Sequence, residues 1–204
     1  MMLDKIQTHI RWWRATREKN TFASFANALK QVCLLTNPQN ILEFGPGFST
    51  NLFLKYTKAK IISFETNPHW YNKYSSFFPT SRTTIVFKEP NWDLSEIKEY
   101  GDTFSLVMID GGNRVDELIY SFDLIDENGL VFLHDAHRED YEPGIRRYPY
   151  IYLPERHSCI LFKSKQLRDR IKENIPPDYS CNCQYCSSDA RREYFNKLLE
   201  LSTQ

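Results

Sequence analysis

The chain has 204 residues, 41% of them apolar, which is enough for one domain with a buried core. Its 26 lysines and arginines balance 26 aspartates and glutamates, so no overall charge draws it to nucleic acid or to an acidic membrane. No apolar run approaches the roughly 20 residues of a membrane span. We therefore expect one soluble domain over residues 1–204, with no membrane partner, and the balanced charge disfavours a nucleic-acid partner.

Two amphipathic stretches open the chain, at residues 3–20 and 21–35. Each has apolar residues at helical spacing among charged ones. They predict two helices within residues 1–37, ahead of the first strand.

Residues 38–164 alternate short β-rich runs with helical stretches. This alternation predicts βαβ units in a Rossmann-like, doubly wound α/β fold with a mostly parallel, seven-stranded sheet. The last two runs, 149–153 and 158–163, have no long helix between them, so we expect an antiparallel pair at one edge. The expected strands are 41–44, 60–65, 83–87, 104–110, 129–135, 149–153 and 158–163, and the expected helices are 48–56, 68–78, 94–100 and 115–125.

Residues 165–204 predict a helical tail that contains the cysteine-rich run CNCQYC. An odd total of five cysteines, three of them in this run, is unlike a secreted disulfide framework and favours a reducing, cytoplasmic location. A zinc site here would need a distant fourth ligand, either His157 or Cys159. We therefore interpret Cys181, Cys183 and Cys186 as reduced loop cysteines.

The loop after the first strand reads ILEFGPGFST, residues 41–50. Gly45 and Gly47 permit a close approach of the backbone to a ligand, and Pro46 stiffens the turn between them. Glu43 stands where a dinucleotide site usually has an apolar residue, and Thr50 replaces the third glycine of G-x-G-x-x-G. Both departures argue against a pyrophosphate site.

Glu65 ends the second strand about 20 residues after the glycines, where an acid can accept hydrogen bonds from ribose. Together these residues resemble class I S-adenosylmethionine-dependent methyltransferases over roughly residues 38–163. The resemblance implies S-adenosylmethionine as cofactor and Glu65 as the ribose contact. It implies a methionyl site on the first loop, at Glu43, Gly45, Pro46, Gly47, Ser49 and Thr50.

The third strand is followed by KEPNWDL, a loop that contacts adenine in many members of this superfamily. Trp92 could stack on the base, and Asp93 could accept from its amino group. Alternatively, Trp92 packs in the core and Asp93 caps the helix that follows. Both alternatives stay open at this point.

Two further strands end in acidic groups, at Asp110 and at the pair His134–Asp135, with His137 two residues later. In a parallel sheet these ends meet on the cofactor's side, so we expect all four to be catalytic, with Asp110 also touching the cofactor. Histidine could act as general base for a hydroxyl, although His134 could instead be a neutral core residue.

The pattern MIDG…R followed by LHD is similar to O-methyltransferases that modify sugars and other small hydroxylated molecules. Several such families hold a divalent cation with an aspartate after the fourth strand and an acidic pair after the fifth. By that likeness the metal group is Asp110, His134 and Asp135, with a histidine in place of one acid. That replacement disfavours Mg²⁺, because Mg²⁺ prefers oxygen ligands.

Arginine and aromatic residues flank these strand ends and predict contacts with the acceptor. Aromatic faces suit sugar rings, and arginines suit phosphate or carboxylate groups. A solvated loop would have the same composition. The predicted acceptor contacts are Arg114, Arg138, Tyr141 and Arg146.

The sequence thus predicts an S-adenosylmethionine-dependent O-methyltransferase that acts on a sugar, a glycan or another small molecule. The alternatives are a nucleic-acid methyltransferase, a dinucleotide-binding oxidoreductase and a non-catalytic cofactor-binding subunit.

Overall fold

The computed structural model describes residues 25–78, 81–180 and 188–203. Its centre is a seven-stranded sheet with the order β3-β2-β1-β4-β5-β7-β6. Strands β1 to β5 are mutually parallel, whereas β7 runs antiparallel to both β5 and β6. The predicted fold class is confirmed, including the antiparallel edge. The strands are β1 (Asn40–Phe44), β2 (Lys60–Glu65), β3 (Thr83–Phe87), β4 (Phe104–Ile109), β5 (Ile125–His134), β6 (Tyr150–Glu155) and β7 (Ser158–Phe162).

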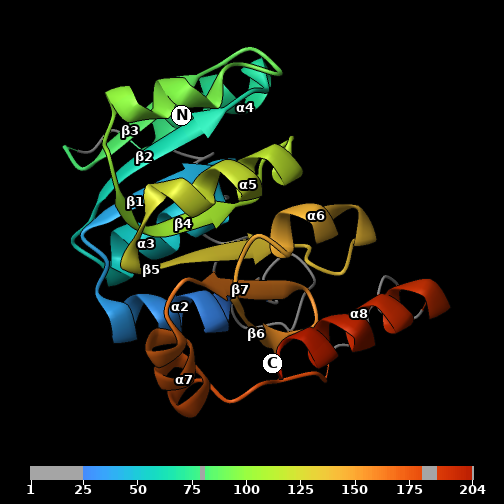
Figure 1. Ribbon diagram of the computed structural model, residues 1–204. Helices are drawn as coiled ribbons and strands as arrows, with labels where there is room; N and C mark the ends of the chain where they lie inside the picture. The colour runs from blue at the N-terminus through green and yellow to red at the C-terminus, as the bar shows by residue number, and fades with distance from the viewer. Residues whose placement is uncertain (1–24, 79–80, 181–187, 204) are drawn as a thin grey trace.

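Helices cover both faces of the sheet because its central strands are apolar on both sides. One face packs against α2 (Ala26–Thr36), α3 (Phe48–Tyr56) and α7 (Lys165–Asn174). The other packs against α5 (Arg114–Leu124), α6 (Glu142–Ile145) and α8 (Asp189–Leu201). Helix α4 (Pro68–Phe77) lies beside β2 and β3. Figure 1 shows this layered arrangement.

Two predicted elements differ in the structure. The stretch predicted as a helix over 94–100 is a short 3-10 helix, η2 (Leu94–Glu99), in which Ile97 alone is buried. The stretch considered as an open loop near Tyr141 forms the 3-10 helix η3 (Glu139–Tyr141) and α6, where an added Cβ at Gly144 would lie 2.6 Å from Leu118 of α5. The first predicted helix and Cys181, Cys183 and Cys186 lie outside the described residues.

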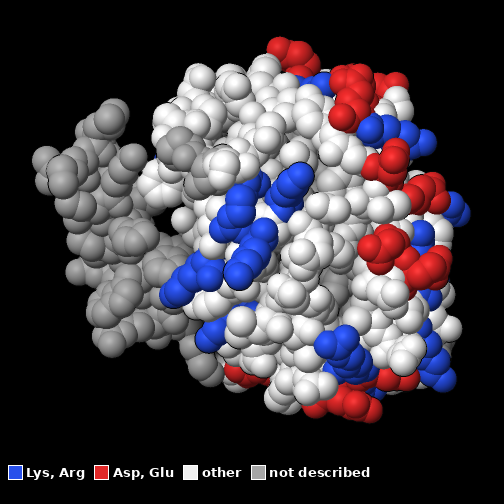
Figure 2. Space-filling view, turned by 90° about the vertical axis from the view of Figure 1, so that its left-hand side faces the viewer, with Lys and Arg blue, Asp and Glu red and all other residues white. Residues whose placement is uncertain are grey.

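The parallel strands point toward the right-hand side of Figure 1, so their carboxyl ends share one edge of the molecule. Figure 2 views the opposite side and shows lysine and arginine side chains gathered near its centre. Although the net charge of the chain is zero, basic side chains are concentrated on this side, away from the strand ends that carry the predicted site. Among the described residues, no helix is both long and apolar enough to cross a membrane.

Candidate active site

The glycine loop packs tightly on the end of β4. Gly45 has a φ of +82°, and a Cβ there would lie 2.6 Å from the main-chain oxygen of Asp110. Its amide donates to the Phe64 carbonyl at 2.9 Å, and the Asp110 amide donates to the Phe44 carbonyl at 3.0 Å. Only glycine fits this position, because both its backbone angle and its surroundings exclude a side chain.

Glu43 lies beneath this loop and is fully buried. Its carboxylate accepts hydrogen bonds from three hydroxyls, those of Ser49 at 2.5 Å, Thr50 at 2.7 Å and Ser63 at 2.6 Å. The Thr50 hydroxyl also accepts from the Gly47 amide at 2.9 Å. Ser49 and Thr50, predicted as cofactor contacts, are buried and hold the loop through Glu43, and their contact with a cofactor stays a prediction. Direct contact of Glu43 with a cofactor stays a prediction.

Burial raises the pKa of Glu43 to about 7, although the three hydroxyls oppose the shift. Since its ordinary value is 4.5, the folded chain keeps a proton that the unfolded chain loses over this range. The free energy of unfolding should therefore fall by about 1 to 3 kcal/mol as the pH rises from about 4.5 through about 7. Glu43→Gln should remove that part of the fall, as measured by urea unfolding at several pH values. Identical pH profiles for Glu43→Gln and wild type would contradict this assignment.

Glu65 and Tyr74 complete the surroundings of the loop. Glu65 accepts from the Asn67 amide at 2.8 Å, and burial, with a smaller effect from Asp110, raises its pKa. A Cβ at Gly47 would lie 3.5 Å from the Tyr74 hydroxyl. Burial and the charges of Glu65, Glu43 and Asp110 raise the pKa of Tyr74. Sequence reasoning missed Tyr74, because α4 reads as an ordinary amphipathic helix.

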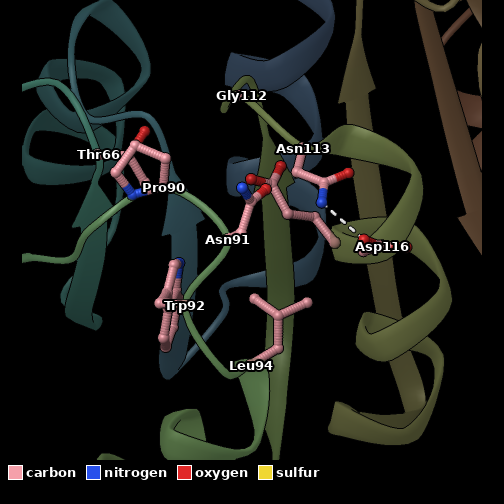
Figure 3. Close-up of a pocket in the computed structure, with 9 residues that line it drawn as sticks. Thr66, Pro90, Asn91, Trp92, Leu94, Gly112, Asn113 and Asp116 are labelled. Carbon is pink, nitrogen blue, oxygen red and sulfur yellow. Dashed lines mark hydrogen bonds between the residues drawn. The ribbon is translucent and has the colours of Figure 1, made fainter.

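A pocket of about 470 Å³ opens between the segment after β3 and the start of α5, with Thr66, which follows β2, also in its wall (Figure 3). Trp92 lines it and stacks on Phe64 with ring centroids 4.6 Å apart, so it has both a packing role and a pocket face. Asp93 is exposed and accepts from the Ser95 amide at 2.8 Å, which makes it the cap of η2. The pocket is lined by Thr66, Pro90, Asn91, Trp92, Leu94, Gly112, Asn113, Asp116 and Glu117.

Glu117 is a second residue that sequence reasoning missed. It comes from the first turns of α5, is buried, and has one carboxyl oxygen without a partner among the described residues. Burial raises its pKa to about 8, with Asp110 adding to the shift and Arg114 opposing it. At neutral pH it is therefore largely a neutral acid on the pocket wall, which can both donate and accept a hydrogen bond.

The ends of β4 and β5 are joined through Arg114. Its guanidinium donates to Asp110 at 2.8 Å, to Asp135 at 3.2 Å and to the main-chain oxygen of His134 at 2.6 Å. Arg114 thus holds the two acids in place, and its predicted contact with the acceptor stays a prediction. Ligand atoms of the predicted metal group, Asp110, His134 and Asp135, lie within 4.8 Å of one another, and a cation that bridges the two carboxylates would lie near the Arg114 charge, so this metal site stays a prediction.

The side chain of His134 belongs to the same network, because it contacts Asp110. Its Nδ1 lies 3.1 Å from Asp110, and its ring packs 4.4 Å from that of Phe25. Burial by itself would lower the pKa of His134, but the hydrogen bond and charge of Asp110 raise it overall. Because Asp110 already bonds to its Nδ1, the predicted catalytic role of His134 stays a prediction.

The other predicted catalytic histidine, His137, lies apart from Asp110. Its Nδ1 is 3.3 Å from Nδ1 of His157, and Asp135 stands next to both rings. Burial, followed by the neighbouring His157, lowers the pKa of His137 to about 4. Its imidazole is therefore neutral at pH 7, and as a general base it would be weak.

The remaining predicted acceptor contacts fall into two groups. Tyr141 is buried, with the guanidinium groups of Arg138 and Arg114 over its ring at 4.9 and 5.5 Å, so it lies directly beside the Asp135 network. Arg146 pairs with Glu142 on the exposed surface of α6. Arg138 also forms an exposed ion pair, with Asp140, and the acceptor contacts of Arg138, Tyr141 and Arg146 all stay predictions.

No known protein-family profile matches the chain, and no curated protein matches its sequence. Solved structures are similar in fold. A methyltransferase from Geobacter sulfurreducens has a TM-score of 0.57 and 12% identity over 78% of this chain and 90% of that one. A methyltransferase from Pyrococcus furiosus has a TM-score of 0.50 and 19% identity over 69% of this chain and 82% of that one. The spermidine synthase of Thermotoga maritima has a TM-score of 0.50 and 14% identity over 86% and 71%.

These likenesses show that the chain shares the fold of these two methyltransferases and of the spermidine synthase. The identities are low, so the similarity establishes the fold and leaves the reaction to be argued from the site.

Proposed function

We propose that this chain transfers a methyl group from S-adenosylmethionine to a hydroxyl of a sugar, a glycan or another small molecule. The observation that carries this proposal is the set of carboxyl groups around the glycine loop. Burial raises the pKa of Tyr74 most, and the charges of Glu65, Glu43 and Asp110 add to the shift, so the three carboxyl groups lie near one another around the loop. Carboxyl groups gathered in this way suit a cation.

S-adenosylmethionine brings such a charge, because its sulfonium and its ammonium are both positive. The pyrophosphate of a dinucleotide is anionic and would face the same carboxyl groups at short range, which is unfavourable. The hydroxyl of Thr50, in the place of the third glycine, also fills the space beneath the loop by bonding to Glu43. Both features favour the sulfonium cofactor over a dinucleotide.

The pocket of Figure 3 supplies the place for the adenine base. Trp92 offers an aromatic face, and Glu117, which also lines the pocket, offers a carboxyl group. A neutral carboxylic acid can donate to a ring nitrogen of adenine while it accepts from the exocyclic amino group. Glu117 would then bind the base by two hydrogen bonds. One of these bonds requires the protonated form of the carboxyl group, which burial favours.

The acceptor would enter beside Asp135, whose side chain is 35% exposed at the end of β5. In the reaction the acceptor oxygen forms a bond to the methyl carbon while the carbon–sulfur bond breaks and its electron pair stays on sulfur. The hydroxyl proton leaves to a base or to water. An alcohol needs help with this loss because its pKa lies far above neutral, and the groups around Asp135 stand where that help is needed.

Glu65→Ala is expected to weaken binding of S-adenosylhomocysteine by about 1 to 3 kcal/mol, because the ribose hydroxyls would lose a buried acceptor. Isothermal titration calorimetry measures this directly. Glu127→Ala is a matched control, since Glu127 is an exposed acid near the start of β5, at the other end of the sheet. Equal affinities for wild type and Glu65→Ala would remove Glu65 from the site.

The acceptor class is tested by a screen of nucleotide sugars, short glycans and simple hydroxylated compounds with methyl-labelled S-adenosylmethionine. We expect label on a hydroxyl oxygen of a sugar-containing compound. Label on a nitrogen, or on nucleic acid, would contradict the proposed acceptor class. Cofactor binding without transfer to any compound would favour a non-catalytic subunit.

A further inference from the structure

A second group of metal-ligand side chains lies beyond the Arg114 network, at the end of β5. Asp135 and His137 follow β5, and His157 lies in the tight turn between β6 and β7. Because β7 pairs antiparallel with β5, with His134 opposite Ser158, this turn is carried to the end of β5. The Ala136 amide donates to the His157 carbonyl at 2.9 Å and fixes the two segments together.

The two imidazoles meet through their Nδ1 atoms, 3.3 Å apart, with ring planes at 87°. Two nitrogens bound at about 2.0 to 2.1 Å to a tetrahedral ion would be separated by about 3.3 Å. One ligand atom each from Asp135, His137 and His157 lies within 4.8 Å of the others. The nitrogens thus already have the spacing of two ligands to one ion, and the carboxylate is near enough to join them.

The ligand types also suit a metal. Imidazole nitrogens and a carboxylate oxygen are ordinary ligands of zinc-like ions. Two imidazoles and one carboxylate form a ligand set suited to zinc-like ions rather than to Mg²⁺.

The backbone conformation of Asp135 is a separate observation that points to a functional site. Asp135 has a φ of +58°, in the left-handed region that a residue with a side chain seldom adopts. Such a conformation persists only where the surroundings impose it, and it occurs often at functional sites. Here it turns the chain sharply between β5 and His137, so that residues two apart contribute to one cluster.

We propose that Asp135, His137 and His157 bind one divalent transition-metal ion of the zinc or cobalt class, with a coordination position open to the acceptor. The two histidines are buried, whereas the Asp135 side chain is 35% exposed, so the open position lies on the side of the carboxylate. A metal there would lower the pKa of a hydroxyl bound to it and so help that hydroxyl lose its proton. His137, whose pKa is about 4, would by comparison be a weak base for removing this proton. This catalytic role rests on the proposed methyl transfer, but the binding of the ion does not.

The test is a titration of the full chain, freed of metal with a chelator, with Co²⁺ followed by its visible absorption and with Zn²⁺ followed by calorimetry. We expect one ion per chain and intense Co²⁺ bands of a four-coordinate site. His157→Ala and His137→Gln should each weaken binding by more than about 100-fold, because loss of even an outer-shell partner costs about 10- to 100-fold. His69→Ala, at an exposed histidine of α4, should bind as wild type does.

Asp110→Asn distinguishes the two groups of ligands, since Asp110 belongs only to the group that contains Arg114. We expect this variant to bind the ion normally. Failure of wild type to bind Co²⁺, equal binding by His157→Ala, or loss of binding in Asp110→Asn alone would each overturn the proposal. Thermal unfolding of each variant confirms that it is folded. Because no cofactor is present, the outcome is independent of S-adenosylhomocysteine binding.

Discussion

Gly45→Ala is expected to abolish measurable binding of S-adenosylhomocysteine and to lower the free energy of unfolding by about 2 to 4 kcal/mol. The φ of +82° costs an alanine about 1 to 2 kcal/mol. Its Cβ would also lie 2.6 Å from the Asp110 carbonyl oxygen, so the loop and the end of β4 must move apart. Urea unfolding and calorimetric titration measure the two effects.

Gly47→Ala is the matched variant for the same loop. Gly47 has a φ of 174°, outside the left-handed region, and a Cβ there would make only an ordinary contact with Tyr74, 3.5 Å from its hydroxyl. We expect nearly normal stability but weaker binding of S-adenosylhomocysteine, because the added methyl group would stand between the loop and the ligand. Normal affinity in Gly47→Ala would contradict a ligand lying flat on this loop, and normal stability in Gly45→Ala would contradict the packing of the loop on β4.

Asp135→Asn is expected to lower methyl transfer by about two to four orders of magnitude and to leave affinity for S-adenosylhomocysteine unchanged. The substitution keeps the size of the side chain but removes the charge that faces Arg114 at 3.2 Å and stands beside His137 and His157. That charge is needed whether the acceptor proton is taken by a base or is released with the help of a metal. Rates are measured with the acceptor that the labelled screen identifies.

Asp140→Asn serves as control, since Asp140 is an exposed acid on η3 that pairs with Arg138. It should retain turnover close to that of wild type. Full activity in Asp135→Asn would place the chemistry elsewhere in the molecule. Lost affinity for S-adenosylhomocysteine would make Asp135 a cofactor residue instead.

The sequence predicted the sheet well because buried parallel strands have a strong signal. The runs at 60–65 and 83–87 match β2 and β3, and the lack of a helix between the last two strands correctly indicated an antiparallel edge. The start of β5 was predicted four residues late, at 129 instead of Ile125. The polar residues DENG (126–129) do not look like a strand, so nothing in the sequence indicates that β5 begins before them. In this part of β5 the pairing with β4 changes register after Phe104.

The site was harder to predict because hydrogen-bond partners come from separate strands. Ser63 reaches Glu43 because β1 and β2 pair in parallel with these two residues in register, which no single segment reveals. The alternation of side-chain direction along KIISFE, together with an assumed register between the two strands, could have predicted the contact of Ser63 with Glu43. The inward direction of Arg114 and the burial of Glu117 depend on the packing of α5 against β4, and a helical pattern alone shows neither.

The meeting of His137 with His157 had no signal in the sequence. The residues are 20 apart, and they are brought together because β7 inserts between β5 and β6. Sequence spacing had suggested His157 only as a distant partner for the cysteine run. A strand order, rather than a motif, creates this cluster.

The central claim is that the loop at residues 43–50 and the adjoining pocket bind a sulfonium cofactor. Parallel calorimetric titrations of the wild-type chain with S-adenosylhomocysteine and with NAD test it most directly. We predict one S-adenosylhomocysteine bound per chain, a rise in the unfolding temperature with ligand concentration, and no binding of NAD. Binding of NAD without binding of S-adenosylhomocysteine would contradict the account and would make the chain a dinucleotide-binding protein.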